Sequence, residues 1–165
     1  MIKKLLLAIM LVLPMVGFAQ GKFGVINTQS LMEGMPEMKE VQTQLEASGK
    51  KYEDEFKALQ DEFQKKYTEL QSMEETTPQT IKDRRVQEIQ ELQQKIEQFR
   101  ATATQDLGRQ QEQLIAPIQQ KVMTAIQAVG DEGGFTFIFE NQVPVYVGKD
   151  AVDVTTLVKG KLGLK

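Results

Sequence analysis

Acidic side chains are the first candidates for a chemical role in this sequence, because several of them are adjacent. They form the groups Glu53-Asp54-Glu55 and Glu74-Glu75. Grouped carboxylates can transfer protons or bind Ca²⁺, but neither group has the alternating ligand spacing of a calcium loop. The chain also has no Cys and no His, so it lacks a thiol nucleophile, a zinc-thiolate site and the commonest general base. We therefore expect no enzyme, no catalytic residue, no metal site and no cofactor.

Two further motifs have both a functional and a simpler interpretation. Gly133-Gly134 does not precede a helix, so we interpret the pair as a helix end before a strand and not as a phosphate-binding loop. Lys82, Arg84 and Arg85 form a basic cluster that could contact acidic partners or lipid headgroups. Such a run is more often a solvated helix face, and we favour that interpretation.

The first 19 residues have the pattern of a cleavable signal peptide. Lys3 and Lys4 precede an apolar stretch, Leu5–Leu13, that is too short to span a bilayer, and Gly17-Phe18-Ala19 supplies the small residues of a cleavage site. We predict a mature chain that starts at Gln20 and is exported beyond the cytoplasmic membrane. A retained N-terminal anchor is the alternative. The rest of the chain has no apolar run of spanning length, so we expect no stable membrane insertion.

The charge balance argues against one class of partner. The chain has 20 basic and 23 acidic residues, and without Lys3 and Lys4 the basic residues fall to 18, a net charge of −5. A nucleic-acid binder would need a basic stripe on its surface. We therefore expect no nucleic-acid partner.

A long helical arm is the dominant element that the sequence predicts. Apolar residues recur at intervals of three, four and seven from Met38 to Val129, and the pattern is interrupted once, at Glu74–Pro78. This spacing places them on one stripe of a helix. We predict two amphipathic helices that fold back as an antiparallel coiled-coil hairpin over residues 36–129, with its tip near residues 74–78.

Three residues are expected to shape the second helix of this arm. Thr77 can act as its N-cap, and Pro78 suits the first helical position, where its missing N–H costs nothing. Pro117 lies inside the helix and removes a backbone hydrogen bond, so we predict a kink there. The kink would separate the arm from a helical segment that belongs to the body of the protein.

The residues on either side of the arm predict a small sheet. Lys22–Asn27, Phe135–Glu140 and Val143–Val147 each have the pattern of a strand, and Asp153 can cap a last helix. The body would thus comprise residues 20–35 and 130–165. The predicted fold class is α+β, with a long antiparallel helical hairpin projecting from a small β-sheet body.

A sheet of this size leaves an apolar face that it cannot bury alone. Alternation places Phe135, Phe137 and Phe139 on one face, and three valines of the last strand also share a face. The simplest physical solution is oligomerisation, with the sheets of several subunits closing on one another, and the residues alone do not fix the number of subunits. The predicted oligomer interface comprises Phe23, Val25, Phe135, Phe137, Phe139, Val143, Val145 and Val147.

Aromatic residues along the arm have two interpretations. They could line a partner-facing surface, since weak and dispersed apolar contacts suit a promiscuous binder. They could instead form the seam between the two helices, which their heptad spacing favours. The candidate surface residues are Tyr52, Phe56, Phe63, Tyr67, Met73 and Phe99.

After residue 19 the sequence resembles the OmpH/Skp family of periplasmic chaperones over essentially its whole length. The resemblance is carried by Lys22–Glu33, Leu114–Glu140 and Val143–Leu162, in this order around a central hairpin. Within the last segment, Asp153-Val154-Thr155 and Leu157 are similar to the start of the family's closing helix.

The resemblance implies a homotrimer in which three short sheets close into a β-barrel body and three hairpins surround a cavity. It also implies a function: an ATP-independent holdase of the periplasm that binds unfolded outer-membrane β-barrel proteins in this cavity and prevents their aggregation. The alternative is a non-catalytic coiled-coil adaptor or structural protein of the cell envelope that docks a folded partner.

The charge of the arm departs from the family pattern. The best-known members are strongly basic and attract acidic clients, whereas residues 36–129 here contain 13 basic and 17 acidic residues. This difference argues against lipopolysaccharide contact and against electrostatic capture of acidic clients. Client choice would then rest on apolar contacts.

Overall fold

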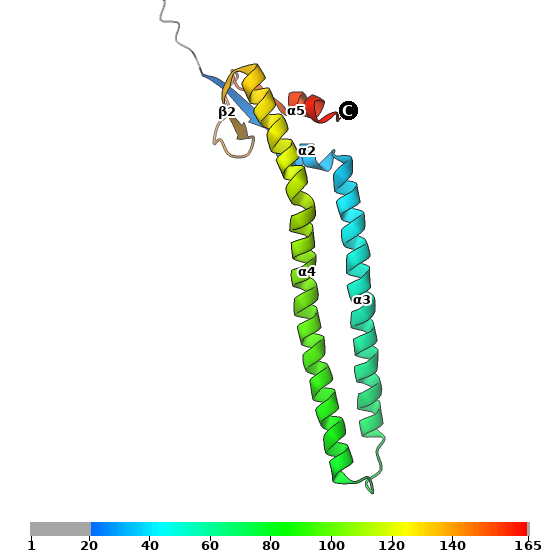
Figure 1. The fold of residues 1–165 in the computed structure, drawn as a ribbon. Coiled ribbons are helices and arrows are strands. Elements are labelled where there is room, and N and C mark those ends of the chain that lie inside the picture. Colours follow the sequence, from blue (N-terminus) through cyan, green and yellow to red (C-terminus); the bar gives the residue numbers. More distant parts are fainter. Residues whose placement is uncertain (1–20, 165) are drawn as a thin grey trace, which may run out of the picture.

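Two long helices project from a small body in the computed structural model, which describes residues 21–164 (Figure 1). The elements in order are β1 (Lys22–Ile26), α2 (Thr28–Glu33), α3 (Pro36–Gln71), α4 (Gln79–Gly133), β2 (Phe135–Glu140), β3 (Val152–Asp153) and α5 (Thr155–Leu162). The prediction of an α+β fold with a helical hairpin and a small sheet at one end is confirmed. The predicted signal peptide lies outside the described residues.

The two arm helices begin at prolines in different ways. Pro36 is the first residue of α3, where its missing N–H leaves no bond unmade. The prediction for the start of α4 is wrong by one residue, because Pro78 is the N-cap and no side chain caps the helix. The backbone of Pro78 is extended, with ψ of 136°, and its carbonyl accepts a hydrogen bond from Ile81 N at 2.9 Å. The proline ring fixes φ but leaves ψ free, so proline can occupy either the N-cap or the first helical position.

The arm is the connection between two parallel strands. β1 is the central strand of the order β2-β1-β3, and it pairs in parallel with both neighbours. Parallel strands require a crossover connection and cannot be joined by a tight turn. Here the crossover from β1 to β2 is α2, α3 and α4, so the hairpin leaves the sheet at one strand and returns at the next.

The predicted strand at Val143–Val147 is wrong. This segment has no regular secondary structure, and the third strand is β3 instead. A hairpin after β2 would have run antiparallel to it, whereas the chain crosses to the far side of β1 and pairs there in parallel. The chain turns directly after β2, where Val143 N donates to the Glu140 carbonyl at 3.0 Å, and Pro144 lacks a donor that a strand would use.

The hydrophobic core lies where the arm meets the body. It is formed by the end of β1, α2, the start of α3, the last part of α4 and the segment from β3 into α5. Its buried members are Ile26, Leu31, Met35, Val41, Ile118, Val122, Ala125, Val129, Val154 and Val158. Four of them lie on α4 after Pro117, so this end of α4 belongs to the body. The kink at Pro117 stays a prediction, since α4 is one continuous helix through it.

Polar contacts and caps fix the ends of the body helices. Gly134 ends α4 in the left-handed conformation, with φ of 63°, so the predicted helix end is confirmed. The predicted cap of α5 is shifted, because Val154 occupies the N-cap position. Asp153 still contributes, since its Oδ1 accepts a hydrogen bond from Thr155 N at 2.9 Å. The hydrogen bonds from Thr155 lower the pKa of the Asp153 carboxyl.

The middle of the arm is loosely packed. On α3 no residue is buried between Val41 and Leu59, and on α4 none is buried between Ala103 and Ile118. Each interval contains a glycine, Gly49 on α3 and Gly108 on α4. A Cβ added at either glycine would meet no atom within 4 Å, and neither has a positive φ. Packing and backbone geometry therefore require neither glycine.

Replacing both glycines should stabilise the arm. Because Ala exceeds Gly in helix propensity by about 1 kcal/mol in an exposed helix interior, we expect Gly49→Ala with Gly108→Ala to raise the free energy of unfolding by up to about 2 kcal/mol. Urea denaturation at one protein concentration measures it.

Gly133→Ala serves as the control for this glycine pair. A Cβ at residue 133 would clash with the Phe135 ring, so this variant should lose stability. If the double variant is no more stable than the natural chain, another interaction at residues 49 and 108 must offset the gain in helix propensity.

Candidate functional site

A bulge in β2 divides the aromatic residues of the sheet between its two faces. Phe23 pairs with Phe137 and Lys22 with Phe135, which leaves Thr136 as an extra residue in β2. The prediction that Phe135 shares a face with the other two phenylalanines of β2 is therefore wrong. Phe135 packs toward the core, its ring lies 4.1 Å from the Lys22 ammonium, and a Cβ on Gly24 would touch it.

The opposite face of the sheet carries three stacked phenylalanines. The ring centroids of Phe23 and Phe137 are 6.3 Å apart, and those of Phe137 and Phe139 are 5.7 Å apart. All three side chains are exposed, Phe137 to 56%. We call these three residues the aromatic face.

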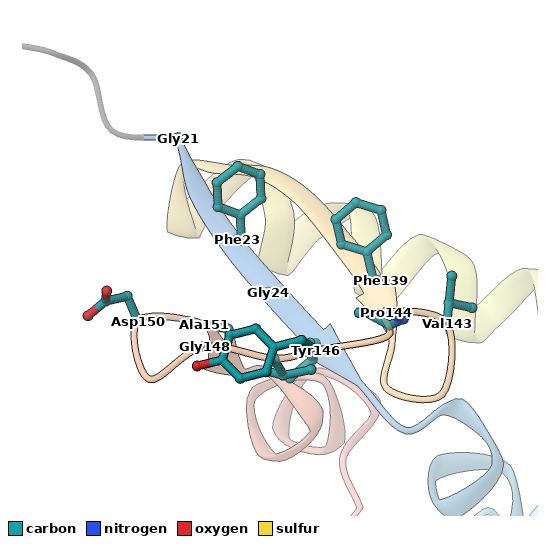
Figure 2. Close-up of a pocket in the computed structure, with 12 residues that line it drawn as sticks. Gly21, Phe23, Gly24, Phe139, Val143, Pro144, Tyr146, Gly148, Asp150 and Ala151 are labelled. Atoms are coloured by element: carbon teal, nitrogen blue, oxygen red, sulfur yellow. The ribbon is translucent and has the colours of Figure 1, made fainter.

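The segment between β2 and β3 extends this apolar surface. Val143, Val145, Tyr146 and Val147 are all exposed, Val145 fully. With Phe23 and Phe139 the segment lines a hollow of about 640 Å³. Figure 2 shows the two phenylalanine rings on the same side of the sheet, with the segment that carries Val143 and Tyr146 running past them.

Such a surface has the properties of an interface. Contiguous exposed apolar patches on a single chain usually mark a site of association. One edge of β2 has no strand partner among residues 21–164, and β3 is only two residues long, so backbone groups at both edges remain open to another chain. Apart from Phe135, the predicted interface residues lie on this face or in the adjoining segment, with Val25 half-buried. Their role in assembly stays a prediction.

The six predicted surface residues of the arm lie at or beside the seam between α3 and α4. The seam itself is closed by Leu59, Ile89, Leu92 and Ala103, which are buried. Of the six, only Tyr67 is exposed, to 43%. Tyr52, Phe56, Phe63, Met73 and Phe99 are half-buried.

Polar contacts tie the two helices together along one edge of the hairpin. The Tyr52 hydroxyl donates to Asp106 Oδ2 at 3.2 Å, and the Tyr52 ring lies 6.0 Å from that of Phe99. Farther out, Lys66 Nζ lies 3.2 Å from Glu88 Oε2. Burial and the bond to Asp106 raise the pKa of Tyr52. We call this side the strapped edge.

The strapped edge continues to the root of the arm. There Lys121 on α4 pairs with Glu37 in the first turn of α3, and this bond lowers the pKa of Glu37. A second ion pair, Lys161 to Glu132 at 2.6 Å, joins α5 to the end of α4.

The basic cluster near the tip is largely engaged within the arm. Arg85 contacts Glu88 at 2.7 Å and Arg84 contacts it at 3.7 Å, while Lys82 Nζ donates to the Glu75 carbonyl at 3.3 Å. The bonds from Arg85 and then from Lys66 hold the pKa of Glu88 below its usual value. Glu88 thus pairs with two of the three cations of the cluster, and the contact of this cluster with a partner stays a prediction.

Val86 and Tyr146 are exposed apolar residues near the two candidate surfaces that sequence reasoning missed. Val86 lies on α4 outside the seam, and Tyr146 lies in the segment after β2; both are exposed. The signal for Val86 was available, because it precedes the seam residue Ile89 by three positions and so falls beside the stripe. Tyr146 was hidden by the alternation of Val143–Val147, which imitates a strand.

Residues 21–164 offer neither a metal site nor a membrane-spanning helix. In this part of the chain no group of three or more His, Cys, Asp or Glu side chains is placed to hold a metal ion. No helix within the same range has both the length and the apolar character needed to cross a membrane.

Comparison with known proteins identifies one family. The model of a family described as "Outer membrane protein (OmpH-like)" matches residues 22–162, which include every helix and strand of the structure. No curated protein matches the chain.

The Glu88 ion pairs should make the arm tip sensitive to acid. Because the folded-state pKa of Glu88 lies below the ordinary 4.5, its contribution to stability is complete above about pH 4.5 and is lost as the pH falls through the lowered value. We expect the Glu88→Gln variant to have a lower free energy of unfolding than the natural chain at neutral pH. On acidification, its free energy of unfolding should fall by less.

Thermal unfolding from about pH 6 to pH 3 measures this difference. Glu91→Gln is the control, since Glu91 bonds to Gln87 on the same helix and does not join the two helices. An acid dependence that is the same in the Glu88→Gln variant and the natural chain would contradict the role of Glu88.

Proposed function

Since the chain belongs to the OmpH-like family, whose members are periplasmic chaperones of outer-membrane proteins, we propose that it is an ATP-independent holdase. It binds unfolded outer-membrane β-barrel proteins between its helical arms and keeps them from aggregating. Binding of the unfolded chain alone lowers the concentration available for aggregation, so no chemical step is required. The periplasm is the proposed location, in agreement with the predicted signal peptide.

The observation that carries this proposal is the free-standing arm. Figure 1 shows α3 and α4 extending together away from the sheet and from the two short helices. With 36 residues in α3, at about 1.5 Å per residue, the arm is roughly 50 Å long. An arm of this length, whose outer part packs against no other element among residues 21–164, can enclose a client when several copies are placed side by side.

Assembly of three chains completes the proposed chaperone. The aromatic face and the segment after β2 would be covered by neighbouring copies, and the open strand edges would pair between them. The three sheets then form a barrel, and the three arms leave it in the same direction. The physics of one chain supports association, and the number three comes from the family resemblance.

The charge of the arm argues against capture of acidic clients. Its acidic residues outnumber its basic ones, and Arg84 and Arg85 of the basic cluster near the tip pair with Glu88. We therefore propose that lipopolysaccharide is not bound by the arm.

Assembly should depend on the aromatic face. The variant Phe137→Ser with Phe139→Ser changes two exposed side chains, so the chain should fold but remain monomeric, and native mass spectrometry gives the stoichiometry. Tyr67→Ser removes a similarly exposed aromatic ring from the arm and should leave the assembly intact. An intact trimer in the double variant would rule out this face as the interface.

Holdase activity should appear as suppressed aggregation. An outer-membrane barrel protein in urea is diluted into buffer with the mature chain, and light scattering is followed. We expect scattering to fall to baseline at one trimer per client without ATP. Unchanged scattering for several unrelated barrel proteins would contradict the holdase and would favour the adaptor that docks one folded partner.

A further inference from the structure

The edge of the hairpin opposite the strapped edge carries a distinct set of side chains. On α3 it is formed at intervals of three and four by Glu53, Phe56, Gln60, Phe63 and Tyr67. On α4 it is formed at the same intervals by Val86, Gln90, Gln93, Glu97 and Arg100. Such spacing places each set on one stripe of its helix. We call the two stripes together the open edge.

A direct contact shows that the two stripes lie on the same side of the arm. The guanidinium of Arg100 on α4 lies 5.8 Å from the centroid of the Phe56 ring on α3. Seven residues farther along α3, toward the tip, the Phe63 ring stacks with the Tyr67 ring, and their centroids are 6.2 Å apart. The open edge is therefore a continuous surface made by both helices.

The open edge differs from the strapped edge in how it is bonded. Within residues 21–164, no hydrogen bond or salt bridge joins α3 to α4 through any residue of the open edge. Two of its apolar side chains are exposed, Tyr67 to 43% and Val86 to 40%, while Phe56 and Phe63 are half-buried. On the strapped edge Tyr52 and Phe99 are both half-buried.

Charge adds a second character to this surface. Glu53 and Glu97 are exposed carboxylates of the open edge, while Arg100 lies over the Phe56 ring. The arm as a whole has four more acidic than basic residues, 17 against 13. Complementary charge on a partner speeds its capture and fixes its preferred orientation. An apolar surface bordered by carboxylates thus fits a segment that carries basic side chains among apolar ones.

From these contacts we infer that the open edge is the client-holding surface of each arm, and that it takes extended unfolded segments in which apolar and basic residues alternate. This inference rests on the proposed holdase function and names the side of the arm that performs it. Phe56, Phe63 and Tyr67 contact apolar client side chains, Gln60 and Gln93 bond to unpaired client backbone groups, and the carboxylates select basic neighbours. The strapped edge holds the two helices together and faces away from the client.

Single cysteines test the inference directly, because the natural chain has none. Gln60→Cys and Gln93→Cys report on the open edge, and Glu62→Cys and Thr102→Cys, also exposed, report on the strapped edge. Each variant is labelled with a photoreactive maleimide and mixed with an unfolded outer-membrane barrel protein. We expect a crosslink yield several-fold higher from residues 60 and 93.

Two outcomes would overturn the inference in different ways. Suppressed aggregation with equal crosslinking from both edges, with more from the strapped edge or with none from either would overturn the open edge and leave the holdase standing. A client that is neither protected nor crosslinked would overturn both.

A matched pair of charge variants tests the preference for basic segments. Glu53→Gln with Glu97→Gln removes two carboxylates from the open edge, and Glu55→Gln with Glu62→Gln removes two from the strapped edge. For an unfolded client with a basic net charge at low salt, the first pair should raise the dissociation constant by about tenfold and the second pair much less. Equal effects of the two pairs would overturn the proposed selection by charge.

Discussion

The parallel pairing of β1 with β2 is the constraint on which the rest of the structure depends. Because parallel strands need a crossover, the chain leaves the sheet after Ile26 and returns only at Phe135. The excursion is the arm, and its root supplies the core, where Val122 and Val129 of α4 meet Leu31 of α2. Among residues 21–164, helices cover one face of the sheet only. The other face keeps its stacked phenylalanines exposed, so the same topology that produces an arm also leaves a surface suited to the proposed assembly.

The two edges of the arm differ in how they are bonded, and the packing of the arm differs along its length. One edge is joined by the bonds of Tyr52 and Lys66 to α4, and the other presents rings and carboxylates without such bonds. Between the body and the outer seam, the arm has a stretch without any buried side chain. In this stretch each helix contains one glycine. In the proposed holdase, weak and dispersed contacts would suit many unfolded chains, and a loosely packed support would allow the arm to adapt to clients of different size.

Local patterns in the sequence predicted the helices well and the sheet less well. Heptad spacing specifies a helix face residue by residue, so the hairpin and its break were found. The bulge at Thr136 and the two-residue strand β3 depend on pairing with β1. The spacing of apolar residues in the sequence does not predict this pairing. The alternation at Val143–Val147 imitates a strand although Val145 is fully exposed. Glu88 was not singled out because its partners come from both helices, and only the folded hairpin brings Lys66 to it.

Native mass spectrometry of the chain from residue 20, alone and with an unfolded outer-membrane barrel protein, is the sharpest test of the proposed trimeric holdase. We expect a trimer by itself and a complex of one trimer with one client after dilution from urea. A chain that stays monomeric, or a trimer that never takes up an unfolded client, would contradict it. In the second case the arm would have to be explained by docking to a folded partner of the cell envelope.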